Sequence, residues 1–467
     1  MLLVIVNKQD RNVLILPKGT TMARMFGTDG VRGVANTDLT CKIAFQLGQA
    51  AVKFQGPRIL VGKDTRLSGD MLEAAVCAGI TSMGGTALLA GIIPTPAIAL
   101  LVKQLNCDGG IVISASHNPP EYNGIKLFDG QGFKLPDKVE DQIQEEIESG
   151  KLDADRPRGD AVGTIEQVDD ALDRYVSHAV DSVRSQGIDF SGLKVALDCG
   201  HGASCVSSVR ALEQLGADVY AMNTDFTGLD INVECGSTNL KPLKQYVQEV
   251  GADVGIAHDG DADRVMLVDG RGNEIDGDMM ESVLALDLKK RGCLPFDTVV
   301  STVMCNLGFV LRMDEEGIKV KQTKVGDRYV LEEMRNEGFA IGGEQSGHLI
   351  MLEHNSTGDG LMTAVQFLAA VRRLGITFEE AAKVFERVPQ ELINVKVFDK
   401  DAVMADEAID AAVKAAENMM GKTGRVLLRP SGTEPVIRVM VECLNTDDAE
   451  KHCNEIAGLV KDMFGIE

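Results

Sequence analysis

Apolar runs of strand length alternate with longer stretches of helical spacing along most of this chain, and this alternation limits the possible fold more than any other feature. A strand followed by a polar turn is expected at residues 58–66, and helical spacing follows at residues 70–83. Residues 194–202 and 298–306 repeat the strand-and-turn form. The pattern is typical of α/β domains. A length of 467 residues suits three or four domains at ~150 residues each.

The chain changes character after residue 388. A strand at residues 393–398 precedes an alanine-rich helix, and two further strands, at 425–429 and 436–442, flank a turn of sequence Pro-Ser-Gly-Thr-Glu-Pro. A final helix is expected at about residues 447–463, with Thr446 or Asn445 as its N-cap. We therefore expect a smaller C-terminal α+β domain.

The N-terminal end and one polar segment set the remaining boundaries. Residues 1–6 are apolar, but no basic segment precedes them and they are too short to span a membrane. We interpret residues 1–21 as an extension that precedes a start at Met22 or Met25. Residues 151–163 are polar and are interpreted as a linker. The predicted domains are residues 22–160, 161–270, 271–388 and 389–467.

Charge and cysteine usage exclude several classes of function. A net charge of −23 argues against a partner that is a nucleic acid or an anionic membrane, because either would be repelled. A phosphorylated ligand would therefore need a local basic pocket. The ten cysteines include no Cys-x-x-Cys pair and are expected to be reduced thiols of a cytoplasmic protein. No glycine pattern of a P-loop or dinucleotide loop and no Gly-x-Ser-x-Gly hydrolase motif is complete in the sequence.

A serine lies in a stiff turn directly after an apolar strand. The strand at residues 111–113 leads into Ser116, His117 and Asn118, and two prolines follow. Strand ends followed by fixed loops are where α/β proteins present reactive groups. Ser116 is therefore a candidate nucleophile or phosphate carrier, although an ordinary polar turn explains the segment equally well.

Three alternate carboxylates form the strongest local signal. Asp259, Asp261 and Asp263 lie between two expected strands, in the sequence Asp-Gly-Asp-Ala-Asp-Arg. Alternate carboxylates can converge on one hard cation, and Mg²⁺ is preferred because it keeps coordination positions for phosphate oxygen and water. An EF-hand is excluded, because its sixth and twelfth positions are Arg264 and Gly270 here. The alternative is an acidic surface turn.

Two further loops have the composition of ligand sites. In the turn from Arg429 to Pro435, backbone N–H groups, two hydroxyls and an arginine suit a phosphate, and Arg438 follows on the next strand. Ordinary hairpin turns share this composition. The segment 343–348, Gly-Glu-Gln-Ser-Gly-His, combines groups that donate and accept hydrogen bonds, as a polyol requires. An ordinary turn whose polar groups form hydrogen bonds only with one another explains this segment equally well.

These four loops, in this order, indicate phosphoryl transfer on a sugar phosphate. From Met25 to the C-terminus the chain resembles the α-D-phosphohexomutase superfamily, through Ser-Ala-Ser-His-Asn-Pro and the aspartate, sugar and phosphate loops just described. The opening Met25-Phe-Gly-Thr-Asp-Gly-Val-Arg-Gly33 and Gln345 are most similar to the bacterial phosphoglucosamine mutase branch. The phosphomannomutase and phosphoglucomutase branches usually have Met at the position of Gln345.

The resemblance implies an α/β fold of three related domains with mixed sheets plus the smaller C-terminal α+β domain, arranged around a central cleft. It implies that Ser116 is the phosphoserine and that one Mg²⁺ is held by Ser116, Asp259, Asp261 and Asp263. Sugar hydroxyls would be bound by Glu344 and Ser346, and the non-reacting phosphate by Arg429, Ser431, Gly432, Thr433 and Arg438. The other expected catalytic residues are Arg32, His117, Lys126, Arg264, Lys324 and His348, with Asp64 and Arg66 as further candidates for the pocket wall.

By the same resemblance, the expected activity is isomerisation of glucosamine 6-phosphate to glucosamine 1-phosphate through a 1,6-bisphosphate. This reaction leads toward UDP-N-acetylglucosamine and the cell wall. The expected partner is the sugar phosphate, with a homodimer in addition. A phosphomannomutase or phosphoglucomutase of the same superfamily is the first alternative, because the motifs define the chemistry better than the substrate. A non-catalytic sugar-phosphate sensor on the same fold is the second.

Overall fold

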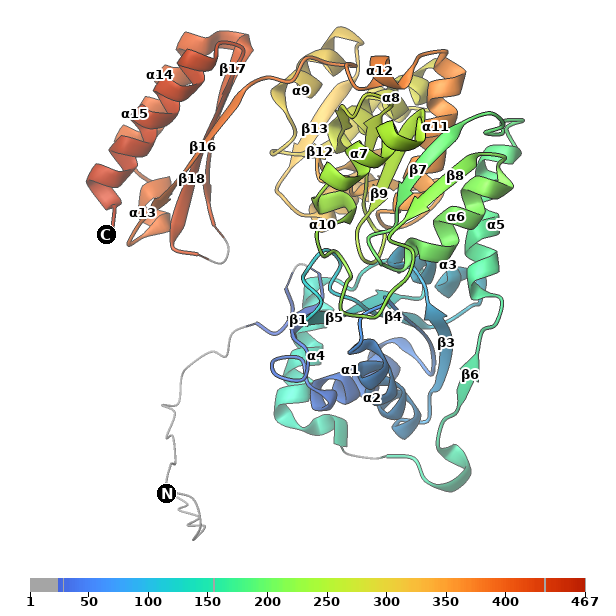
Figure 1. Ribbon diagram of the computed structural model, residues 1–467. Coiled ribbons are helices and arrows are strands. Elements are labelled where there is room, and N and C mark those ends of the chain that lie inside the picture. Colours follow the sequence, from blue (N-terminus) through green and yellow to red (C-terminus); the bar gives the residue numbers. More distant parts are fainter. Residues whose placement is uncertain (1–23, 28, 154–155, 432–433, 467) are drawn as a thin grey trace, which may run out of the picture.

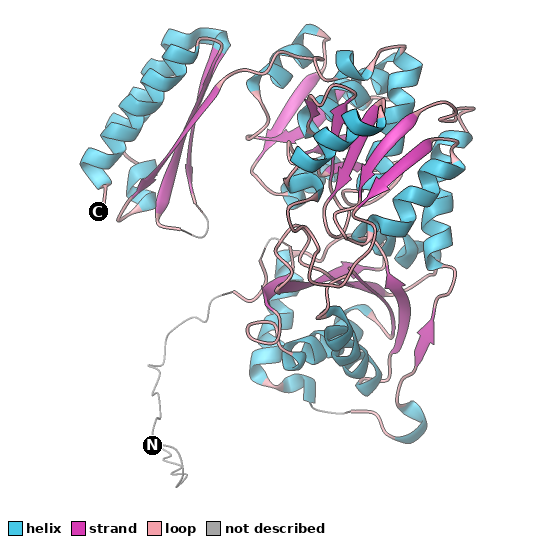
Figure 2. Ribbon diagram, in the orientation of Figure 1, coloured by secondary structure: helices cyan, strands magenta, loops and turns pink. Residues whose placement is uncertain are grey.

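The computed structural model describes residues 24–27, 29–153, 156–431 and 434–466, which form four α/β or α+β domains (Figure 1). The expected N-terminal extension, the suggested start at Met22, and Gly432 and Thr433 of the phosphate loop lie outside the described residues. Figure 2 shows strands gathered into separate sheets with helices packed along them.

The first domain contains a six-stranded mixed sheet of order β1-β5-β4-β2-β3-β6. β4 is buried along its whole length, as expected for a central strand covered on both faces. Its elements are β1 (Val31–Val34), α1 (Cys41–Gln55), β2 (Arg58–Lys63), α2 (Gly69–Ser82), β3 (Thr86–Ile92), α3 (Thr95–Gln104), β4 (Gly109–Ile113), β5 (Tyr122–Asp129), α4 (Asp137–Ser149) and β6 (Ile165–Gln167).

The first sheet continues beyond the boundary expected at residue 160. β6 pairs in parallel with β3, so the segment after the polar linker returns to the edge of the first sheet before the second domain begins. The sequence gives little sign of this, because the three residues of β6 are all exposed and have no buried side chain to mark a strand.

The second domain contains a five-stranded mixed sheet of order β11-β10-β9-β7-β8. β7 and β9 are parallel neighbours, and β10 returns antiparallel to β9, so that the loop between β9 and β10 leaves the carboxyl end of a central strand. The elements are α5 (Ala171–Arg184), β7 (Lys194–Asp198), α6 (Ser204–Gln214), β8 (Asp218–Met222), α7 (Lys241–Val250), β9 (Val254–His258), β10 (Val265–Asp269) and β11 (Glu274–Ile275).

The third domain contains a four-stranded mixed sheet of order β13-β12-β14-β15. Its helix α11 is buried on all sides over the first three turns, which makes it the central packing element between the second and third domains. The elements are α8 (Gly277–Lys290), β12 (Thr298–Thr302), α9 (Leu307–Glu315), β13 (Lys319–Thr323), α10 (Asp327–Glu337), β14 (Ile341–Gly343), β15 (Leu349–Met351), α11 (Gly360–Leu374) and α12 (Phe378–Ala381).

The C-terminal domain has an antiparallel three-stranded sheet of order β16-β18-β17 with helices on one face. Its hydrophobic core is its own, whereas one continuous core joins the first three domains. The last helix begins after Asn445, whose side chain caps it as expected. The elements are β16 (Gln390–Lys396), α13 (Lys400–Met404), α14 (Glu407–Met420), β17 (Gly424–Pro430), β18 (Val436–Cys443) and α15 (Thr446–Phe464).

The predicted fold class, three α/β domains with mixed sheets and a smaller C-terminal α+β domain, is confirmed. Among the described residues, no helix combines the length and apolarity that crossing a bilayer requires.

Candidate active site between the first three domains

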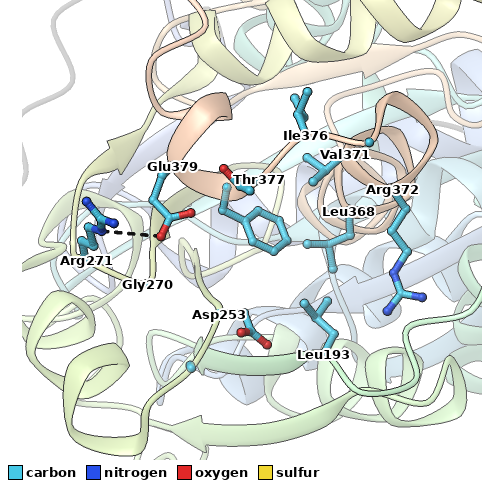
Figure 3. Close-up of a pocket in the computed structure, with 13 residues that line it drawn as sticks. Leu193, Asp253, Gly270, Arg271, Leu368, Val371, Arg372, Ile376, Thr377 and Glu379 are labelled. Carbon is cyan, nitrogen blue, oxygen red and sulfur yellow. Dashed lines mark ion pairs between the residues drawn. The ribbon is translucent and has the colours of Figure 1, made fainter.

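Three of the four predicted loops, the serine, aspartate and sugar loops, meet at a cavity of about 560 Å³ between the first three domains, whereas no described residue of the phosphate loop lines it. Its walls come from Arg24, Met25, Gly27, Asp29, Gly30, Arg32, His117, Lys134, Asp263, Arg264, Val325, Gly326, Asp327, Glu344 and His348. A second cavity of about 560 Å³ lies where α11 and α12 meet the second domain (Figure 3). Its wall mixes aliphatic side chains with charged ones, and Arg271 and Glu379 form an ion pair of 3.6 Å there. The first cavity is the candidate active site, because it alone of these two borders the predicted reactive groups.

Ser116 lies in a rigid loop beyond the end of β4. Its backbone φ is +53°, a left-handed conformation that non-glycine residues seldom adopt and that surrounding contacts must hold. Buried Arg66 supplies those contacts, since its guanidinium donates to the carbonyl oxygens of Ser116 and Asn118 at 2.9 and 2.8 Å. Asp64 in turn pairs with Arg66 at 2.9 Å. These two residues lie beneath the serine loop and do not line the pocket, contrary to our expectation for them.

The Ser116 hydroxyl is held between an imidazole and a carboxylate. Its Oγ donates to Asp259 Oδ2 at 2.5 Å and lies 3.2 Å from His117 Nδ1. Burial, with help from Arg264 and Arg32, lowers the pKa of His117 to about 4. His117 is therefore neutral near pH 7, and its low pKa makes it a weak base.

The loop between β9 and β10 brings three buried carboxylates together. One oxygen each of Asp259, Asp261 and Asp263 lies within 4.8 Å of the others. Burial, followed by repulsion from Asp263 and Asp261, raises the pKa of Asp259 well above its usual range. Oδ1 of Asp261 and Oδ1 of Asp263 are buried without a hydrogen-bond partner. A divalent cation fits this donor set, because it would neutralise the repulsion and coordinate the unpaired oxygens.

Lys126 is the internal charge partner of these carboxylates. Its ammonium lies 2.8 Å from Asp261 and 3.6 Å from Asp263, and it also contacts Asp29 at 2.9 Å. Burial opposes its charge, but the carboxylates outweigh burial and raise its pKa. Lys126 is 1% exposed and stays protonated. Its role is therefore to balance the charge of the carboxylates and not to transfer a proton.

Two arginines face the cavity with unused hydrogen-bonding capacity. Arg32 pairs with Asp29 and donates to Asn118 at 3.0 Å, and Arg264 lies 3.8 Å from Asp263. The Nε atoms of both arginines are buried and have no hydrogen-bond partner. Unsatisfied guanidinium donors at a cavity wall suit an anionic group such as a phosphoryl.

The sugar loop lies opposite the serine loop. Glu344 lines the cavity and accepts a hydrogen bond from Gly326 N at 3.1 Å. Burial would lower the pKa of His348, but Asp263 and Asp327 outweigh it and raise that pKa. Ser346 and Lys324 are exposed, and Lys324 directly precedes the cavity segment Val325–Asp327.

Several charged residues at the site were missed by the sequence reasoning. Asp29 bridges Arg32, Lys126 and Lys134, and Lys134 also pairs with Asp327 at 2.7 Å. Asp29 lies within the Phe-Gly-Thr-Asp-Gly motif, which was the available signal. Lys134 and Asp327 carry no local signal, because each obtains its role from a partner in another domain.

The C-terminal domain carries two adjacent arginines. Arg429 and Arg438 are directly opposite each other on β17 and β18. Burial and the charge of Arg438 lower the pKa of Arg429. Two like charges directly opposite each other repel, and a bound anion would relieve that repulsion. Ser431 is buried beside them, and its carbonyl oxygen accepts a hydrogen bond from Lys400 at 2.6 Å.

Comparison with known proteins agrees with this arrangement. Four domain families described as phosphoglucomutase/phosphomannomutase match in order: α/β/α domain I at residues 23–154, domain II at 173–272, domain III at 276–388 and the C-terminal domain at 392–459. A phosphoglucomutase/phosphomannomutase family protein from Burkholderia thailandensis has a similar structure, with a TM-score of 0.79 and 24% identity over 93% of this chain and 98% of its own.

Curated relatives are much more similar in sequence. A phosphoglucosamine mutase of Ruminiclostridium cellulolyticum is 49% identical over 448 residues, which cover 94% of this chain and 99% of the relative. The phosphoglucosamine mutase of Moorella thermoacetica is 49% identical over 450 residues and is covered completely. Since these similarities extend over nearly the whole length of each protein, the chain belongs to the phosphoglucomutase/phosphomannomutase family and, within it, to the phosphoglucosamine mutases.

Proposed function

We propose that this protein interconverts glucosamine 6-phosphate and glucosamine 1-phosphate, with Ser116 as the phosphoryl carrier. The observation that carries the proposal is the hydrogen bond between the Ser116 hydroxyl and Asp259, within a cluster of three aspartates beside the cavity. The name shared by relatives that are 49% identical supports glucosamine as the sugar.

Two transfers in opposite directions account for the isomerisation. In the first, the 1-hydroxyl of glucosamine 6-phosphate attacks the phosphorus of phospho-Ser116, a new O–P bond forms, and the serine O–P bond breaks. The attacking hydroxyl loses its proton, and the serine oxygen regains one, so that glucosamine 1,6-bisphosphate and a free hydroxyl result. In the second, Ser116 attacks the 6-phosphoryl group and glucosamine 1-phosphate is released.

The residues around Ser116 are suited to these steps. A phosphoserine carries about −1.5 to −2 charges at neutral pH, so it needs compensation beside three aspartates. Mg²⁺ held by Asp259, Asp261, Asp263 and the phosphoserine would supply electrostatic stabilisation of the transferred group. Arg32 and Arg264 face the cavity where the phosphoryl oxygens would lie, and neutral His117 lies 3.2 Å from the Ser116 hydroxyl.

The two-ended intermediate explains the separate C-terminal domain. Each phosphate of the bisphosphate must in turn face Ser116 while the other is held by Arg429 and Arg438. A domain with its own core is able to follow this turn, and we propose that it moves during the cycle. A crosslink between the C-terminal domain and the third domain is expected to block turnover. Unchanged turnover in the crosslinked protein would contradict the motion.

The substrate is tested by comparing kcat/KM on glucosamine, glucose and mannose 6-phosphates. The amino sugar is expected to give the highest value. A higher value on glucose or mannose would instead favour a phosphoglucomutase or phosphomannomutase. Binding without turnover on all three would favour the sugar-phosphate sensor.

The cellular compartment and the oligomeric state are further proposals. All ten cysteines are unpaired and eight of them are buried, which supports a reducing compartment such as the cytoplasm. A homodimer stays a prediction.

A further inference from the structure

A buried carboxylate outside the cavity joins the sugar loop to the C-terminal domain. Asp278 is in the first turn of α8 and is fully buried. One of its oxygens, Oδ2, accepts hydrogen bonds from Gln345 Nε2 at 3.2 Å and from the backbone N–H of Asn306 at 2.7 Å. A buried acceptor oxygen without hydrogen bonds destabilises the fold, so both hydrogen bonds to Oδ2 are favoured. Because they share one acceptor, Gln345 Nε2 and the backbone N–H of Asn306 are held at a fixed distance from each other.

The first donor belongs to the sugar loop. Gln345 lies between Glu344 and Ser346, the residues assigned to sugar hydroxyls, and Gln345 is not among the residues of the cavity wall. Its carbonyl oxygen also accepts a hydrogen bond from Gly277 N at 3.0 Å. A side chain at Gly277 would collide with Glu344 O, since an added Cβ would lie only 2.0 Å from that atom. The start of α8 therefore supports the sugar loop from behind.

The second donor belongs to the junction with the C-terminal domain. Asn306 donates through its amide to Val388 O at 3.0 Å and to Glu442 Oε1 at 3.1 Å. Glu442 is fully buried, accepts a further bond from Leu307 N at 3.1 Å, and pairs with Arg425 at 2.6 Å. Glu442 is four residues after Arg438 on β18, on the same face of that strand.

We propose that Asp278 is a positioning residue for the substrate: through Gln345 and Asn306 it sets the position of the sugar loop relative to the C-terminal domain, which carries the phosphate-binding arginines, in the conformation that binds the substrate. This inference rests on the proposed function, because it assigns the sugar to Glu344 and Ser346 and the distal phosphate to Arg429 and Arg438. A sugar phosphate has a fixed distance between its hydroxyls and its phosphate, so both sites must be in register to bind it.

The role needs an acceptor atom but no charge. Burial, followed by the charge of Asp276, raises the pKa of Asp278 well above its usual range and so favours the neutral acid. Its other oxygen, Oδ1, has no partner. An amide at this position keeps an oxygen that accepts both hydrogen bonds, whereas alanine removes the acceptor and frees both loops.

The test compares four single variants and one double variant by KM and kcat on glucosamine 6-phosphate, with a thermal melt of each. Asp278→Ala is expected to raise KM roughly five- to tenfold, with a smaller change in kcat, because the sugar loop is no longer held in place relative to the C-terminal domain. Asp278→Asn is expected to keep the wild-type KM. Gln345→Ala, at a half-buried loop position where folding is not at risk, is expected to raise KM as Asp278→Ala does.

Asp287→Ala is the matched control. Asp287 is a buried carboxylate on the same helix α8, but it pairs with Arg373 at 2.7 Å and Arg291 at 3.0 Å, away from both loops. This variant is expected to lower the melting temperature without changing KM.

Three results would overturn the inference: a wild-type KM in both Asp278→Ala and Gln345→Ala, an equal rise of KM in Asp278→Asn, or an equal rise in Asp287→Ala. The double variant Asp278→Ala/Gln345→Ala is expected to have a KM no higher than that of the single variant with the higher KM, since both substitutions remove the same contact. The proposed function fails separately, if the wild-type protein does not turn over glucosamine 6-phosphate at all.

Discussion

The hydroxyl of Ser116 donates a hydrogen bond to Asp259 Oδ2 over 2.5 Å, although the two residues are 143 positions apart in the chain and belong to different domains. This bond places the candidate phosphate carrier against the candidate metal loop. The left-handed backbone at Ser116 and its support by Arg66 hold the hydroxyl there without help from a ligand. Such preorganisation is what in-line phosphoryl transfer requires.

Ser116→Ala is predicted to lower kcat at least about a thousandfold, because it removes the phosphoryl acceptor. The hydroxyl is small, so the variant is expected to fold and to bind glucosamine 6-phosphate with nearly wild-type affinity. Turnover and substrate binding by calorimetry check this. In the wild-type protein, a mass spectrum of the peptide 104–126 should show a partial phosphate on Ser116. Full mutase activity in the variant would remove Ser116 from the mechanism.

Removal of divalent cations is predicted to abolish turnover, and added Mg²⁺ is predicted to restore it. The cation relieves repulsion among Asp259, Asp261 and Asp263 only in the folded protein, so it should also raise the melting temperature. A ligand at about one hundred times its Kd contributes about 2.7 kcal/mol in this way. Potassium chloride at the same ionic strength is the control. Equal melting curves with chelator and with Mg²⁺ would argue against a bound cation.

Gly202→Ala is predicted to weaken Mg²⁺ binding about tenfold or more. A Cβ at Gly202 would lie 2.5 Å from Gly260 O, within the metal loop, and the neighbouring backbone is not free to yield. Gly458→Ala is the matched control, because nothing lies within 4 Å of its Cβ position and the residue is helical, where alanine is favoured. The Mg²⁺ dependence of activity checks both variants. An unchanged dependence in Gly202→Ala would mean that the loop tolerates displacement.

The loops that follow strands could be predicted from the sequence, whereas their charge partners could not. Ser116 and the three aspartates could be recognised in the sequence because reactive side chains follow the ends of apolar strands, where α/β sheets present functional groups. Lys134 and Asp278 look like ordinary charges of an acidic protein. Lys134 acquires its role from Asp29 and Asp327, and Asp278 from Gln345 and Asn306. The Lys134–Asp327 contact depends on how two domains pack, and the others depend on how distant segments of one domain pack, which no local pattern encodes.

Glu140 is predicted to make the protein less stable as pH rises. Its carboxylate joins Arg24 at 3.0 Å and Arg328 of the third domain at 3.2 Å. Burial outweighs Arg24 and raises the pKa of Glu140 to about 7, above an ordinary value near 4.5. Between these two values the folded protein holds the extra proton, so the free energy of unfolding falls with rising pH.

Melting temperatures from pH 5 to pH 8 check this effect. The decline should be smaller in Glu140→Gln than in the wild-type protein, because the amide does not titrate. Glu146→Gln, on the same helix α4, is the control, since Glu146 pairs with Lys53 at the surface and such pairs contribute little. Parallel pH profiles for Glu140→Gln and the wild-type protein would show that Glu140 titrates normally.

Arg438→Ala is predicted to raise KM for the sugar phosphate roughly ten- to a hundredfold while leaving stability unchanged or slightly higher. Arg438 faces Arg429 across two antiparallel strands, and its removal relieves their repulsion in the free protein but loses a charge-assisted contact with the phosphate. Inorganic phosphate should therefore raise the melting temperature of the wild-type protein more than that of the variant. Arg312→Ala serves as control and should keep the wild-type KM, because Arg312 is a half-buried arginine on α9 that pairs with Glu316 at 2.6 Å, far from the phosphate loop in the sequence. If Arg438→Ala bound phosphate and substrate like the wild-type protein, the distal phosphate would have to be held elsewhere, and the paired arginines would then be a source of strain without function.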